Sequence, residues 1–99
     1  MLRAVFVRTL KSGVTYDQFR AAWAPVERTG TYPARVRVAR NVADDRQVVT
    51  IVELDVPLSE FEAVRSSLTR PDALERLAGV IESTELEGLY EDVFDESAL

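Results

Sequence analysis

The sequence of 99 residues contains neither histidine nor cysteine, and these two absences exclude several classes of function. Without histidine, the chain cannot build Ser-His-Asp or Cys-His catalytic machinery, and it cannot ligate haem or a metal through imidazole. Without cysteine, it has no disulfide, no thiolate nucleophile and no cysteine zinc site. We therefore expect neither a metal nor a cofactor.

Long apolar runs and phosphate-binding motifs are also missing. No segment approaches the roughly 18 apolar residues of a membrane-spanning helix, and the apolar run at residues 4–7 is too short for a signal peptide. There is no GxGxxG motif and no P-loop, and a net charge of -5 without a basic, aromatic surface argues against nucleic acid. We expect a cytoplasmic protein that binds neither membrane nor nucleic acid.

The length leaves room for one domain, residues 1–99, with an acidic tail at about 96–99. Charge is distributed unevenly along it. Residues 1–50 hold nine basic and four acidic residues, whereas residues 51–99 hold three basic and thirteen acidic ones. Either these charges lie on separate solvated faces, or the basic half meets the acidic half.

Hydrophobic periodicity predicts four strands and two helical regions. Strands are expected at 2–10, 34–43, 47–55 and 85–95, and helices at 15–24, 59–68 and, restarted by a proline, 71–82. We expect a hairpin turn at 44–46 and a bulge at Gly88. The order β-α-β-β-α-β predicts a ferredoxin-like α+β fold, in which both helices cover one face of a four-stranded antiparallel sheet.

The opposite face of this sheet cannot be wholly polar. Val49 and Ile51 share one face of the third predicted strand, and the first strand offers either Phe6 or Val5 and Val7. An exposed patch of such residues marks an interaction site. A second copy of the chain would cover it, and we therefore expect a homodimer.

Several segments resemble the dimeric α+β barrel superfamily, which includes the antibiotic-biosynthesis monooxygenases and EthD-like small bacterial proteins. The resemblance spans about residues 2–95 and rests on Arg8-Thr9-Leu10-Lys11-Ser12-Gly13, Thr15-Tyr16-Asp17-Gln18-Phe19, Trp23 and the helix restarted at Pro71. It implies that two sheets form a barrel and that each subunit has a ligand pocket between its sheet and helices. Because the chain has no histidine, it does not match the haem-dependent and histidine-dependent branches of this superfamily.

The resemblance also implies that the fourth-strand edge of one subunit lies near the second-strand edge of its partner. Charges on these edges are then expected to pair across the dimer. The residues expected to take part are Arg35, Arg37, Arg40, Glu53, Glu87, Glu91 and Asp92.

Four residues are candidates for ligand contact, and three of them have a structural alternative. Trp23 is either a core residue or a pocket wall, and Tyr32 is either a loop residue or a hydrogen-bond donor to a ligand. Arg8 is either a structural charge or an anion contact, and Tyr90 is expected to line the barrel. No residue stands out as a general base.

Two functions fit these observations. The first is a cofactor-independent, monooxygenase-like enzyme in which a phenolic or quinol substrate itself supplies electrons to dioxygen. The second is a dimeric ligand-binding or structural protein without catalytic activity.

Overall fold

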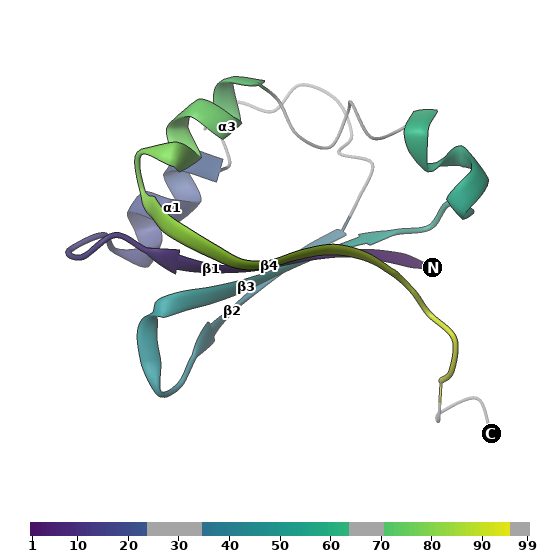
Figure 1. Cartoon of the computed structure of the whole chain (residues 1–99), viewed down its shortest axis with the longest axis horizontal. Coiled ribbons are helices and arrows are strands. Elements are labelled where there is room, and N and C mark those ends of the chain that lie inside the picture. The colour runs from purple at the N-terminus through teal and green to yellow at the C-terminus, as the bar shows by residue number, and fades with distance from the viewer. Residues whose placement is uncertain (24–34, 64–70, 96–99) are drawn as a thin grey trace.

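The computed structural model describes residues 1–23, 35–63 and 71–95 of a ferredoxin-like α+β protein. Its elements are β1 (Leu2–Leu10), α1 (Tyr16–Trp23), β2 (Arg35–Asn41), β3 (Asp44–Leu54), the 3-10 helix η1 (Leu58–Glu60), α3 (Pro71–Ala78) and β4 (Ile81–Glu91) (Figure 1). The strands form one antiparallel sheet in the order β2-β3-β1-β4. The predicted fold is confirmed. None of the described helices is long and apolar enough to cross a membrane.

The boundary between α3 and β4 differs from the prediction. The helix ends at Ala78 rather than residue 82, and the strand begins at Ile81 rather than residue 85 and ends at Glu91. The backbone N–H groups of Gly79 and Val80 donate to carbonyls of the last helical turn, and the N–H of Lys11 donates to the carbonyl of Val80 at 2.9 Å. This last bond ties the chain to β1 and starts the strand earlier than local periodicity indicated.

Two predicted irregularities lie elsewhere. The β2–β3 turn is Val42–Ala43, not residues 44–46, because the Asn41 side chain accepts the N–H of Ala43 at 2.8 Å and closes the turn early. Gly88 pairs regularly with Val5, so the bulge predicted there is wrong. The irregularities of the β1–β4 ladder lie between Val7 and Arg8 and between Thr9 and Leu10.

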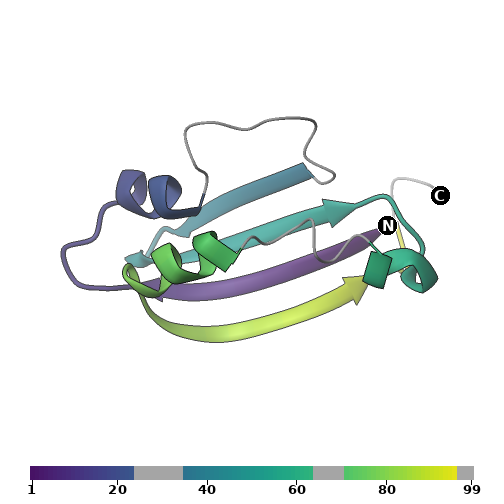
Figure 2. The same ribbon diagram turned by 90° about the horizontal axis from the view of Figure 1, so that it is seen from above.

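The start of α1 is fixed by the predicted capping box. The N–H of Thr15 donates to Oε1 of Gln18 at 2.8 Å, and the N–H of Gln18 donates to Oγ1 of Thr15 at 3.2 Å. Helices α1 and α3 pack against each other over one end of the sheet (Figure 2). Nε of Arg76 on α3 donates to the carbonyl of Ala22 on α1 at 2.9 Å, which links the two helices.

The hydrophobic core is divided into two clusters on the helix-covered face of the sheet. One cluster lies beneath α1 and α3 and comprises Leu10, Phe19, Ala22, Val48 and Leu77. The other comprises Leu2, Val52 and Leu54, with Phe61 beside η1 packed against them. Of the helix predicted at 59–68, residues 58–60 form η1 and 61–63 are helical, and the rest lies outside the described residues.

The other side of the sheet, here called the open face, carries no helix of the described chain (Figure 1). Cross-strand pairing places Val5 beside Ile51 and Val7 beside Val49 at its centre. Leu86 of β4, 39% exposed, continues the row of Val7. The side chains expected on an uncovered apolar face are therefore Val5 and Val7, not Phe6.

Candidate functional site

A band of polar residues separates the two core clusters on the helix-covered face. The register aligns Thr50 of β3, Phe6 of β1 and Glu87 of β4 in one row across the sheet. The adjacent row contains Arg8, flanked by Val48 and Thr84. Two charged groups and a hydroxyl thus lie between the apolar residues of the two clusters.

Arg8 is the central group of this band. Its Cζ lies 4.3 Å from the centroid of the Phe6 ring, a cation–π geometry. Burial disfavours the charged guanidinium and lowers the pKa of Arg8, and the nearby Glu87 carboxylate opposes this shift only in part. Within the described residues, no group accepts a hydrogen bond from Arg8. The half-buried guanidinium therefore has N–H donors that no described residue accepts.

Thr50 carries a second unused polar group. The residue is 1% exposed, and its Oγ1 has no hydrogen-bond partner among the residues that the structure describes. Buried hydroxyls are nearly always hydrogen-bonded, so an unpaired one calls for a missing partner. Thr50 stands directly beside Phe6, the ring beneath the Arg8 guanidinium. Both groups can donate hydrogen bonds, and a half-buried guanidinium without a described acceptor suits an anion or another acceptor-rich group.

The predicted ligand contacts divide between the two faces. Trp23, at the end of α1, is half-buried and packs against the cluster beneath the helices, on the same side as Arg8. Tyr90 is on the open face, in register with Arg3, and its ring covers Gly88, where an added Cβ would lie 2.9 Å from Cε2. Arg8 and Tyr90 therefore cannot line one site. Tyr32 lies outside the described residues.

Sequence reasoning did not single out Thr50. The signal was present, since this threonine interrupts the alternate apolar positions Val48, Val52 and Leu54 of β3. Threonine is common in strands, however, and only burial without a partner distinguishes this one.

The expected dimer charges also separate by face. Arg35, Arg37, Glu53 and Asp92 share the open face, whereas Arg40, Glu87 and Glu91 are in register with helix-side residues. Arg3, which was not among the expected residues, organises the open-face group. Its Nη1 lies 2.9 Å from Oε1 of Glu53, and its Nε lies 2.8 Å from Oδ1 of Asp92. The hydrogen bond from Arg3 lowers the pKa of Asp92.

No family model matches the chain, and no curated protein matches its sequence. Two crystal structures share its fold. One is a candidate antibiotic biosynthesis monooxygenase from Chloroflexus aurantiacus J-10-fl, with a TM-score of 0.64 and 14% identity over 96% of this chain and 95% of that one. The other is a dimeric protein of unknown function and ferredoxin-like fold from Bacteroides fragilis NCTC 9343, with a TM-score of 0.56 and 16% identity over 92% and 95%. The likeness establishes the fold.

Proposed function

We propose that this protein is a homodimer in which each subunit binds a small acceptor-rich molecule at Arg8, on the helix-covered face. The observation that carries the proposal is the Arg8 guanidinium in the middle of the sheet, which together with the nearby Thr50 hydroxyl has no hydrogen-bond partner among the described residues. A partly desolvated charge that has no acceptor in the described part of the chain costs stability, and such costs are typical of binding sites. The homodimer draws support from the uncovered open face and from the dimeric neighbour of the same fold.

The chemistry that best suits this site is cofactor-independent oxygenation of a phenol or quinol. Arg8 stabilises the phenolate, whose electrons add to dioxygen at a ring carbon that bears hydrogen. The resulting hydroperoxide loses water and leaves one oxygen atom as a carbonyl. The substrate supplies both hydrogens of that water, so no external reductant is required. The fold shared with a candidate monooxygenase supports this proposal.

A second candidate is a ligand-binding or structural protein without catalytic activity. It is favoured by the composition of the polar band, in which the exposed Glu87 is the only carboxylate among the residues that the structure describes. Its charge attracts Arg8, and a general base for phenol ionisation would need a second proton acceptor beside them.

Binding and turnover can be separated with the single tryptophan, which lies on the same side as Arg8. Phenol, a quinol series and benzoate are titrated while Trp23 fluorescence is recorded, and oxygen uptake is measured with the metal-free protein. We expect saturable quenching that Arg8→Gln weakens at least about tenfold, since it removes a charged hydrogen bond. Arg20→Gln, on the exposed surface of α1, is the matched control.

The outcomes distinguish the candidates. Binding with oxygen uptake supports the enzyme, and binding without uptake across the series supports the non-catalytic protein. If no probe binds, or if Arg8→Gln binds as tightly as the parent, the proposed site is wrong. Sedimentation equilibrium tests the homodimer separately, and a monomer at micromolar concentration would contradict it.

A further inference from the structure

On the helix-covered face, a carboxylate lies close to the guanidinium of Arg8 without pairing with it. Glu87 stands opposite Phe6 in the ladder between β1 and β4. The Arg8 guanidinium lies over the ring of Phe6, with Cζ 4.3 Å from the ring centroid, and this contact brings it toward the row of Glu87. Long side chains at diagonal positions of neighbouring strands are within reach of each other.

Two observations describe how these charges are separated. Burial lowers the pKa of Arg8, and the Glu87 carboxylate offsets this shift in part, so the charge of Glu87 acts on the guanidinium. Neither residue, however, belongs to an ion pair within the described part of the chain, where Arg3, Arg37 and Arg46 hold the paired carboxylates. The guanidinium and the carboxylate therefore attract each other across a gap.

We propose that Glu87 determines which ligand binds at Arg8, by selecting an uncharged group that both accepts and donates a hydrogen bond, such as a phenolic hydroxyl, over a carboxylate. This inference rests on the ligand site of the proposed function and specifies its ligand class. The ligand oxygen accepts a hydrogen bond from the guanidinium, and the ligand hydroxyl donates one to Glu87. With lengths of about 2.9 and 2.7 Å, these two bonds let a single hydroxyl bridge two charges that are not in contact.

A carboxylate ligand would suit Arg8 alone but not Arg8 together with Glu87. It accepts hydrogen bonds from the guanidinium, but it has no hydrogen to donate to Glu87 and brings a second negative charge beside it. Because water screens charges less in a half-buried site, the repulsion between the two carboxylates is strong there. Glu87 thus opposes the attraction that Arg8 exerts on anions, and specificity comes from this repulsive element.

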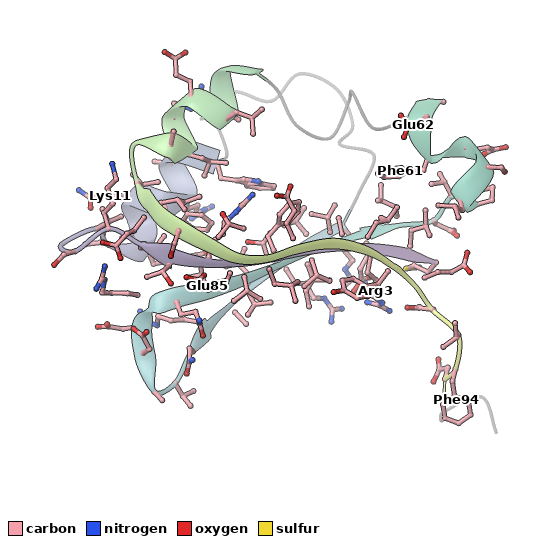
Figure 3. The ribbon with its side chains drawn as sticks, viewed as in Figure 1. Arg3, Lys11, Phe61, Glu62, Glu85 and Phe94 are labelled. Atoms are coloured by element: carbon pink, nitrogen blue, oxygen red, sulfur yellow. The ribbon has the colours of Figure 1, made fainter. Side chains whose placement is uncertain are left out.

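Two other carboxylates of β4 are placed differently. Glu85 accepts a hydrogen bond from the hydroxyl of Thr9 at 2.7 Å. Figure 3 shows Glu85 on the open face and Phe61 on the opposite, helix-covered side. Glu91 shares the helix-covered face with Glu87 but lies at the end of the strand, away from Arg8. Among these three carboxylates, Glu87 is the one that acts on the guanidinium.

Benzoate and benzamide separate the effect of charge from the effect of shape, because they have nearly the same outline and benzamide is uncharged. The carbonyl of benzamide accepts hydrogen bonds and its amide N–H groups donate them. Isothermal titration calorimetry measures the dissociation constants of both compounds, and of phenol, with the parent and with Glu87→Gln. We expect the parent to bind phenol and benzamide more tightly than benzoate. Glu87→Gln should tighten benzoate at least about tenfold and change benzamide less than about threefold.

Glu91→Gln is the matched control, since it makes the same change on the same strand and the same face. It should leave the ratio of the benzoate and benzamide dissociation constants unchanged. Circular dichroism checks the fold of both variants, and Glu87→Thr, which suits a strand, repeats the test should Glu87→Gln not fold. A purely structural role of Glu87 would alter the binding of both compounds together and would not move their ratio.

The inference is overturned if the parent binds benzoate as tightly as benzamide or more tightly, or if Glu87→Gln and Glu91→Gln shift the ratio alike. In both cases, binding that Arg8→Gln weakens leaves the proposed ligand site itself intact. If phenol, benzamide and benzoate all fail to bind, the ligand site and this inference fail together.

Discussion

The guanidinium of Arg8 lies over the ring of Phe6, with Cζ 4.3 Å from the ring centroid, and no described residue accepts a hydrogen bond from it. The ring supplies the cation with a favourable surface but does not replace the water lost on burial. A residue kept at such a cost fits a role in binding rather than in folding.

The first prediction is that Arg8→Met leaves the fold as stable as the parent or stabilises it by up to about 1 kcal/mol. Methionine retains the packing of the side chain and removes a charge that burial disfavours. Urea unfolding of the two proteins measures the difference. A loss of 2 kcal/mol or more would show that Arg8 is a structural charge, in contradiction to the proposed site.

The second prediction concerns the buried hydroxyl of Thr50. Thr50→Val should raise the free energy of unfolding by about 1 kcal/mol, because it removes a buried hydroxyl that has no partner in the described part of the chain. Thr9→Val is the contrasting variant, since the hydroxyl of Thr9 donates to Glu85 at 2.7 Å. Thr9→Val should not raise the free energy of unfolding, because it removes a hydroxyl that has a partner. Equal effects of the two variants in urea unfolding would argue that Thr50 is satisfied in solution.

The third prediction addresses the start of α1. Thr15→Ala removes the hydroxyl that accepts the N–H of Gln18, and it should destabilise the protein by about 1 kcal/mol. Ser12→Ala, in the exposed turn before the helix, serves as the control. Thermal unfolding should therefore show a lower midpoint for Thr15→Ala only.

The fourth prediction follows from the pKa of Asp92, which its hydrogen bond to Arg3 lowers. As the pH falls, the unfolded chain takes up this proton before the folded one does, so the stability from the pair is present at neutral pH. It should decline as the pH falls through the ordinary aspartate range near about 4 and below. The gap in unfolding free energy between the parent and Asp92→Asn should narrow over that range.

An NMR titration of the carboxyl carbons tests the cause of this shift. Arg3→Gln should return the pKa of Asp92 toward its ordinary value. The pKa of Glu85 should stay low in the same variant, because its lowering comes from the hydroxyls of Ser83 and Thr9 rather than from Arg3. If both values rise together, or neither does, the assigned causes are wrong.

Local signals sufficed for the elements whose determinants lie within a few residues. The alternation in β1, the capping box of Thr15 and Gln18, and the β-α-β-β-α-β order were all readable from the sequence, and the structure confirms them. Boundaries set by distant groups were not readable. The early start of β4 depends on a bond between Lys11 and Val80, which lie far apart in the chain.

The sequence by itself determined the fold, the absence of histidine and cysteine chemistry, and the existence of an apolar face that two helices cannot cover. Only the tertiary structure decided which groups share a face and which buried groups lack partners. It separated Arg8 from Tyr90, joined Arg3 to Glu53 and Asp92, and placed Thr50 where no described residue bonds its hydroxyl. The physical reason is that strand periodicity specifies alternation, whereas register between strands distant in sequence specifies neighbours.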